Sequence, residues 1–190
     1  MKTSAFRLLI SFFVLALALT ACGQPYTFHG TLLEPPLATS DFALVDQNGQ
    51  AARLSDYSGQ LVLLFFGYTD CPDACPATLA QFKQIRAELG DKADRVSFVL
   101  ITVDPERDTP ERLKEYLAQF DSSFIGLTGS ADALQSVYRE YGVSVQPAVA
   151  LAHTSSVFLL DREGRVQLIY TDIPWQDTAA DLRRLLDSSD

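Results

Sequence analysis

Two cysteines stand four positions apart in the stretch GYTDCPDACPATL, residues 67–79. Thioredoxin-type redox motifs separate their cysteines by three positions, and most zinc sites need four ligands. Cys71 and Cys75 can form a disulfide, or, as thiolates, they can bind a soft metal ion. At this spacing on helical backbone both sulfurs point the same way, so the spacing alone does not choose between a metal site and a bond.

The neighbouring residues predict that the two cysteines lie between a buried strand and a helix. The apolar run at residues 60–67, QLVLLFFG, is typical of a strand buried on both faces. Residues 76–90 carry apolar side chains at helical spacing and end in glycine. Cys71 is therefore expected in the loop and Cys75 near the first helical turn, where unpaired N–H groups and the helix dipole favour a thiolate.

A third ligand is needed to choose between the two kinds of chemistry, and the chain has two histidines. His29 lies in the N-terminal stretch, where we expect an exposed side chain without a partner. His153 precedes a predicted hairpin strand, and the loop before that strand should lie beside the cysteine loop; otherwise it is an ordinary surface or core histidine. Two thiolates and one imidazole suit Cu(I) best, with Cu(II) also possible, because structural zinc and iron–sulfur clusters usually need four ligands.

The order of predicted elements defines the fold class and the domain. Beyond the elements around the cysteines we expect strands at 41–46, 95–104 and 124–129, helices at 109–120, 130–142 and 175–187, and a hairpin at 156–170. Alternating strands and helices followed by an antiparallel hairpin indicate an α/β domain, residues 41–190, with a central mixed sheet flanked by helices on both faces.

The N-terminal segment predicts export and lipid attachment. Residues 1–21 contain a basic start and an apolar run at 8–19 that is too short to span a membrane, which is typical of a signal peptide. The sequence LTAC ending at Cys22 resembles the lipobox of bacterial lipoproteins, although an uncleaved anchor or an ordinary signal peptide is also compatible with it. Cys22 would then carry the lipid, residues 22–40 would form a tether and an irregular lead-in, and the domain would lie on the extracytoplasmic side of a bacterial membrane. In that compartment a structural disulfide is the default for two cysteines.

The acidic composition argues against nucleic acid as a partner, and one acidic residue is expected close to the cysteines. The formal net charge of −9 makes nucleic acid a poor partner, because phosphates require basic patches. The stretch DPERDTPE at residues 104–111 contains four acidic residues, which we interpret as loop and helix-start residues favoured by the dipole rather than as a metal site. Asp104, at the end of a central strand, is expected to approach the cysteine loop and support the ligands.

Three stretches together resemble one family, the Sco/SenC copper proteins: residues 65–79, 102–116 and 153–164. With residues 28–36 and 41–50 the resemblance covers nearly all of 28–187. It implies a thioredoxin-like fold with extra elements before the cysteine-bearing strand, and Cys71, Cys75 and His153 as copper ligands. It further implies delivery of copper to the binuclear centre of cytochrome c oxidase subunit II. One departure is Asp70, since many members carry histidine or another non-acidic residue immediately before the first cysteine.

Two functions remain open. A metallochaperone, which is not an enzyme, binds copper and passes it on by ligand exchange. A thiol–disulfide oxidoreductase would reduce the cysteines of the copper acceptor through a redox-active disulfide between Cys71 and Cys75. Redox enzymes of this fold resemble one another in having CxxC and a cis-proline, where this chain has Ser155. A peroxidase requires a single cysteine in a Thr-x-x-Cys setting, and a purely structural disulfide leaves His153 without a role.

Overall fold

The computed structural model describes residues 26–144, 156–172 and 174–188 of the 190-residue chain. Its strands are β1 (Thr31–Leu37), β2 (Ala43–Asp46), β3 (Ala51–Arg53), β4 (Leu61–Gly67), β5 (Val96–Thr102), β6 (Ile125–Thr128), β7 (Ser156–Leu160) and β8 (Val166–Thr171). Its α-helices are α2 (Ala74–Leu89), α3 (Pro110–Leu117), α4 (Ala131–Glu140) and α5 (Trp175–Asp187). None of the helices in these three ranges is both long and apolar enough to cross a membrane.

All eight strands form one mixed sheet in the order β1-β8-β7-β4-β5-β6-β2-β3. The centre is parallel, since β4 pairs with β5 and β5 with β6 in that sense. The remaining pairs are antiparallel, including the predicted β7–β8 hairpin, which turns at Gly164 with φ +76°. The predicted α/β class with a mixed central sheet is confirmed.

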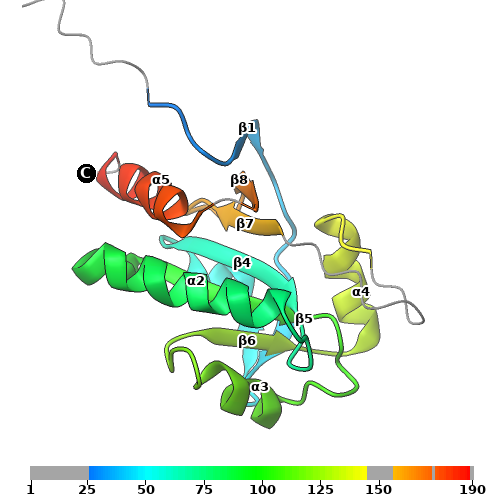
Figure 1. Ribbon diagram of the computed structural model, residues 1–190. Helices are drawn as coiled ribbons and strands as arrows, with labels where there is room; N and C mark the ends of the chain where they lie inside the picture. The colour runs from blue at the N-terminus through cyan, green and yellow to red at the C-terminus, as the bar shows by residue number, and fades with distance from the viewer. Residues whose placement is uncertain (1–25, 145–155, 173, 189–190) are drawn as a thin grey trace, which may run out of the picture.

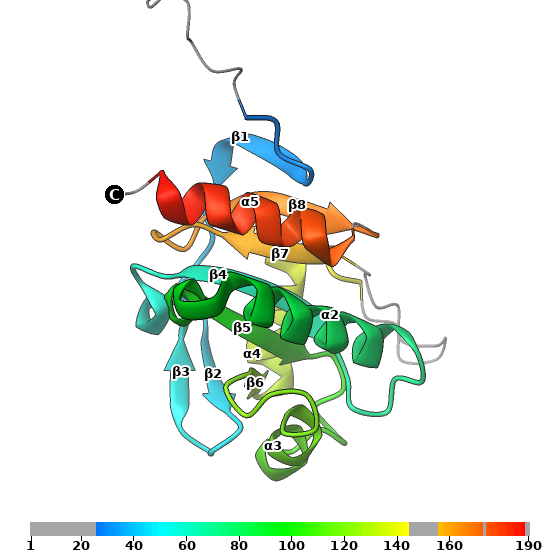
Figure 2. The same cartoon turned by 60° about the vertical axis from the view of Figure 1, so that its left-hand side comes forward.

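Helices cover both faces of this sheet. Figures 1 and 2 show α2 and α5 side by side on one face and α4 on the other, while α3 packs along β6. All seven residues of β4 are buried, as its uninterrupted apolar run predicts. An aromatic cluster fills each side of the core: Phe82, Phe98 and Phe124 near α2, and Phe66, Tyr138, Tyr141 and Phe158 near α4. The cysteine-bearing segment therefore extends from a fully buried strand at the centre of the sheet.

The helices begin where the capping signals predict. Thr109 precedes α3, with Pro110 as the first helical residue, and its side chain accepts a hydrogen bond from the N–H of Arg112. Ser130 caps α4 in the same way, accepting from the N–H of Ala133. These two caps fix where the chain turns back onto the sheet after β5 and after β6.

The lead-in differs from the irregular segment expected from its composition. Residues 31–37 form β1, an edge strand that pairs antiparallel with β8. Its Glu34, Pro35 and Pro36 interrupt any alternation, and the pairing register shifts between Leu32 and Leu37. A sheet edge tolerates this because proline there loses no hydrogen bond to a second neighbour. The expectation of an irregular lead-in is therefore wrong for these seven residues.

His29 is not the unpartnered side chain that was expected. Its Nδ1 lies 2.9 Å from the carboxylate of Asp181 on α5, and its backbone N–H donates to the same group at 3.0 Å. Asp181 is completely buried. It also accepts from Tyr26 Oη at 2.7 Å, Gly30 N at 3.2 Å and Tyr170 Oη at 3.2 Å. A buried carboxylate thus fastens the lead-in to α5.

Candidate metal centre

The two cysteines lie at the carboxyl end of β4, where the chain leaves the sheet and enters α2. Cys71 sits in the connecting turn and Cys75 in the first turn of α2, as predicted. Both are free thiols, 6% and 0% exposed respectively. The N–H of Cys75 donates to the sulfur of Cys71 at 3.3 Å. The pair is therefore held against the start of a helix, beneath the surface.

The surroundings shift the two thiol pKa values in opposite directions. Burial acts against ionisation of Cys71, but hydrogen bonds from Cys75 and from backbone N–H groups of the first turn outweigh it, so its pKa lies below the ordinary value. Burial, followed by the hydrogen bond to Cys71, raises the pKa of Cys75. Cys71 therefore ionises more readily than Cys75, and Cys75 is the hydrogen-bond donor of the pair.

This asymmetry predicts which cysteine reacts first. In the reduced, metal-free full chain at pH 7.5, we expect iodoacetamide to modify Cys71 before Cys75, because only a thiolate attacks and Cys75 is both protonated and fully buried. Peptide mapping by mass spectrometry at successive times measures the two rates separately. Equal rates, or faster modification of Cys75, would contradict this assignment.

Gly67, the last residue of β4, makes room for the sulfur of Cys75. A Cβ added at Gly67 would lie 2.9 Å from Cys75 Sγ and 2.6 Å from Phe65 Cε1. Both distances are shorter than carbon side chains tolerate, and Phe65 is completely buried and cannot move outward. The glycine is therefore required by close packing against the thiol.

Gly67→Ala is accordingly expected to destabilise the fold by about 1–3 kcal/mol and to displace the Cys75 sulfur. Gly129→Ala, directly after β6, is the matched control, since its Cβ would lie 2.9 Å from Leu44 Cδ2 on β2, a strand that carries no cysteine. Denaturant unfolding should show a loss in both variants. Only Gly67→Ala should change the alkylation rates of the cysteines, and an unchanged pattern would count against the packing role.

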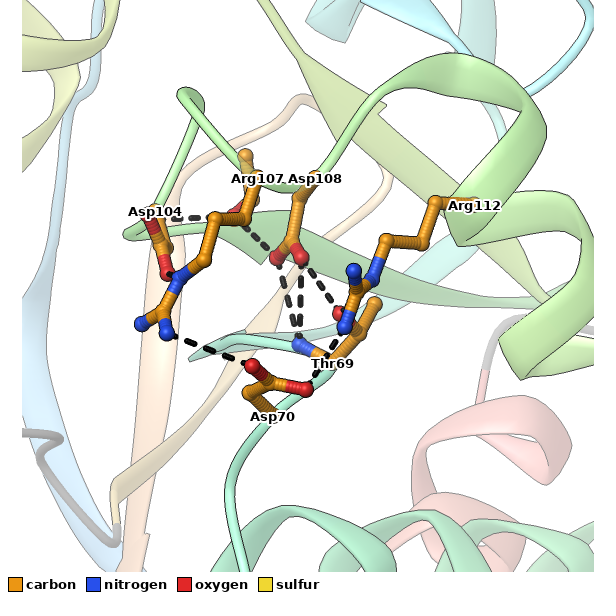
Figure 3. A network of polar contacts seen from close by, with 7 residues as sticks. Thr69, Asp70, Asp104, Arg107, Asp108 and Arg112 are labelled. Atoms are coloured by element: carbon orange, nitrogen blue, oxygen red, sulfur yellow. Dashed lines mark hydrogen bonds and ion pairs between the residues drawn. The ribbon is translucent and has the colours of Figure 1, made fainter.

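Asp70, the residue directly before Cys71, is held by two arginines. Its carboxylate lies 3.2 Å from Arg107 Nη1 and 2.6 Å from Arg112 Nη2, and Figure 3 shows the two guanidinium groups on either side of it. An isolated carboxylate here would oppose formation of a thiolate on Cys71. The two positive charges compensate it, so the departure from the family pattern comes with its own counter-ions.

Two other acidic residues of the β5–α3 segment join this network. Asp104 forms an ion pair with Arg107, and so reaches the cysteine turn only through Arg107 and Asp70. Asp108 is completely buried and accepts hydrogen bonds from Thr69 in the turn itself (Figure 3). The sequence alone indicated that Asp108 is a loop or helix-start residue favoured by the helix dipole, and it did not single out Thr69. No local pattern marks either residue.

Three residues singled out in the sequence lie outside the described residues. They are His153, the expected third ligand, Cys22, the expected site of lipidation, and Ser155. Within the described ranges no group of three or more His, Cys, Asp or Glu side chains is placed to hold a metal ion. The site that these ranges contain is the thiol pair, and it has two soft donors.

Comparison with known proteins identifies the family. The sequence profile of the SCO1/SenC family matches residues 31–187, and the chain belongs to this family. A SCO2-like protein of Rickettsia conorii is 39% identical over 133 residues, which are 66% of this chain and 65% of that protein. The chain thus spans about two thirds of the length of that relative.

Solved structures agree with the thioredoxin-like fold of the family. ScoI of Bradyrhizobium japonicum, solved with copper bound, has a TM-score of 0.71 and 37% identity, covering 77% of this chain and 98% of that one. The protein BsSco, described as having a disulfide switch and as a member of the Sco family of cytochrome c oxidase assembly proteins, has a TM-score of 0.68 and 24% identity over 83% of this chain and 97% of its own. The predicted family and thioredoxin-like fold are confirmed.

Proposed function

We propose that this chain is a copper metallochaperone. It holds one copper ion through the thiolates of Cys71 and Cys75 and the imidazole of His153, and it passes the ion to the binuclear copper centre of cytochrome c oxidase subunit II. The observation that supports this most directly is the pair of free, buried thiols at the start of α2, in a chain similar to a copper-bound relative. Copper is the cargo of the protein, and no bond of a substrate is broken.

The donor set suits the reduced ion. Soft thiolates select Cu(I), while His153 would supply a borderline nitrogen donor that Cu(II) also accepts. Cys71 loses its proton more readily than an ordinary thiol because its pKa is lowered, whereas the pKa of Cys75 is raised and its proton must leave when the metal enters, so uptake releases protons. A site of only three ligands leaves room for an incoming thiolate of the acceptor, which favours transfer.

The place of action follows from the expected lipidation of Cys22. A lipid on this residue would anchor the exported domain to the outer side of a bacterial membrane, close to membrane-bound oxidases. A mass measurement of the membrane-extracted chain tests this part of the proposal, because removal of residues 1–21 and addition of acyl groups change the mass by a defined amount.

The second candidate function is reduction of the acceptor's cysteines. The unequal thiols favour it, since a thiolate on Cys71 can attack a disulfide and Cys75 can then resolve the mixed disulfide. Both functions use the same two cysteines, so substitution of either thiol cannot separate them. Only the histidine distinguishes them.

The experiment that tests the proposed function is anaerobic titration of the reduced protein with Cu(I) against a chromophoric chelator. We expect about one tightly held copper per chain, and none in Cys71→Ser or Cys75→Ser. A wild-type protein that takes up no copper would overturn the metallochaperone. Reductase activity towards a disulfide substrate that His153→Ala leaves unchanged would favour the oxidoreductase.

A further inference from the structure

Cys71 is the last residue of a tight turn whose two central residues are both held from outside. The N–H of Cys71 donates to the carbonyl of Tyr68 at 3.3 Å, which closes a four-residue turn with Thr69 and Asp70 at its centre. Thr69 is held by Asp108, and Asp70 by Arg107 and Arg112, all from the segment that follows β5. The conformation of the turn that carries Cys71 is therefore supported by that segment.

On the inner side of the turn, Asp108 holds Thr69 through hydrogen bonds. Its carboxylate accepts from the backbone N–H of Thr69 at 3.2 Å, from Thr69 Oγ1 at 2.6 Å and from Thr102 Oγ1 at 2.6 Å. Asp108 is 0% exposed. A buried carboxylate is costly to desolvate and persists only where donors compensate it. Two of its three donors belong to the residue that lies two positions before Cys71.

On the outer side of the turn, Arg107 and Arg112 form ion pairs with Asp70 at 3.2 Å and 2.6 Å. Arg112 Nε also donates to Thr69 Oγ1 at 2.8 Å, so this hydroxyl accepts from the arginine and donates to Asp108. All three holding side chains come from one stretch, residues 107–112, between β5 and the first turn of α3 (Figure 3). Cys75 is placed by α2, and its N–H also donates to the Cys71 sulfur. The 107–112 stretch therefore supports the turn that carries Cys71 in addition to the contact that α2 makes with its sulfur.

We propose that Asp108 is a positioning residue for the metal-binding thiols. Through Thr69 it fixes the turn that carries Cys71, and so holds the Cys71 sulfur at the start of α2 in the geometry that a metal ion needs. The proposal rests on the proposed function for the identity of the cargo. The arrangement itself is a property of the metal-free protein.

The inner contact should matter more than the outer one. Asp70, Arg107 and Arg112 are each 44–50% exposed, and exposed ion pairs contribute little because water screens them. The Asp108 carboxylate is completely buried and Thr69 is partly buried, so removal of one partner leaves a buried group unsatisfied. We therefore expect Asp70→Asn to change copper affinity by less than about threefold, well below the effect of Asp108→Asn.

The test compares Asp108→Asn with Asp181→Asn in the full chain purified in detergent. Both substitutions remove a completely buried carboxylate that accepts several hydrogen bonds, but Asp181 binds the lead-in and not the cysteine turn. In competition titrations with Cu(I), Asp108→Asn should lower the affinity about tenfold, the lower end of the range for groups that orient metal ligands. Asp181→Asn should leave the affinity unchanged while it lowers the melting temperature.

A second pair of variants, at Thr69, tests the same contact without relying on the folding of Asp108→Asn. Thr69→Ser retains the hydroxyl, whereas Thr69→Val has nearly the same shape and loses it. Thr69→Val should reproduce the loss of Cu(I) affinity, and Thr69→Ser should preserve the wild-type value. Amide hydrogen exchange of residues 69–75 in the metal-free protein should become faster in Thr69→Val and in Asp108→Asn only.

The outcomes separate this proposal from the proposed function. Wild-type protein that binds no copper would overturn the metallochaperone, and the exchange rates of metal-free protein would then decide the positioning role alone. Unchanged affinity and unchanged exchange in both Asp108→Asn and Thr69→Val would overturn the positioning role. An equal loss of affinity in Asp181→Asn would also overturn it, because the effect would then follow general stability.

Discussion

His153→Ala is expected to lower the Cu(I) affinity of the protein by more than about a hundredfold. Loss of a group that only orients a metal ligand typically costs ten- to a hundredfold, and His153 is proposed to donate to the metal itself. Two thiolates alone still bind Cu(I), so some affinity should remain. The measurement is an anaerobic competition titration of the reduced full chain, with the fitted stoichiometry as a second readout.

The chain provides its own control, because it has only one other histidine. His29→Ala removes an imidazole that contacts Asp181 on α5, far along the chain from the cysteine turn, and should leave the copper affinity within experimental error. If His153→Ala and His29→Ala bind copper equally well, the three-ligand site is wrong. A two-thiol site or a redox pair would then be the better description.

The parts of the fold that could be predicted are those whose signal is local. β4 could be recognised because a strand covered on both faces requires an apolar side chain at every position, and residues 61–66 satisfy this. The caps at Thr109 and Ser130 could be predicted because a capping side chain and the N–H it accepts from are three residues apart. The placement of Cys75 in the first turn of α2 follows from the same kind of information.

The parts that could not be predicted depend on partners far away in sequence. β1 is a strand because β8, about 130 residues later, offers an edge to it, while its own prolines argue against one. Asp108 and Asp181 are buried although aspartate is usually exposed. Donors from distant segments decide their burial, and no periodicity within α5 or the β5–α3 segment reveals those donors. The role proposed for His153 as a copper ligand comes from the resemblance to the family, because composition and spacing left it open.

Asp181→Ala is expected to lower the free energy of unfolding by about 3 kcal/mol or more. Its removal leaves two buried donors, Gly30 N and Tyr170 Oη, without an acceptor, at about 1–3 kcal/mol each. It also releases Tyr26 and His29, and with them the attachment of the lead-in to α5. Denaturant unfolding monitored by circular dichroism measures the loss, and hydrogen exchange of residues 26–37 should show which segment is freed.

Asp177→Ala is the matched control on the same helix. Its carboxylate lies 3.7 Å from His29 Nε2 and is 41% exposed, so its loss should cost less than about 1 kcal/mol. Equal destabilisation by the two substitutions would show that the buried hydrogen bonds of Asp181 add no stability beyond that of an exposed ion pair, which would contradict the account of the lead-in as fastened to α5 through this residue.

The pH dependence of stability gives an independent readout of the same contact. The hydrogen bond to Asp181 is the largest influence that raises the pKa of His29, with burial opposing it and the charges of Asp181 and Asp177 adding to it. Since the folded-state pKa exceeds the unfolded value of about 6.5, the stabilisation from protonated His29 is complete below that pH and is lost as pH rises through the folded-state pKa. The effect is small because the His29 side chain is 41% exposed. In Asp181→Ala, an NMR titration should place the His29 pKa closer to its ordinary value than in wild type. The melting temperature of this variant should also lose the part of its pH dependence that wild type shows above pH 6. A His29 pKa equal to that of wild type would mean that Asp177 alone holds the imidazole.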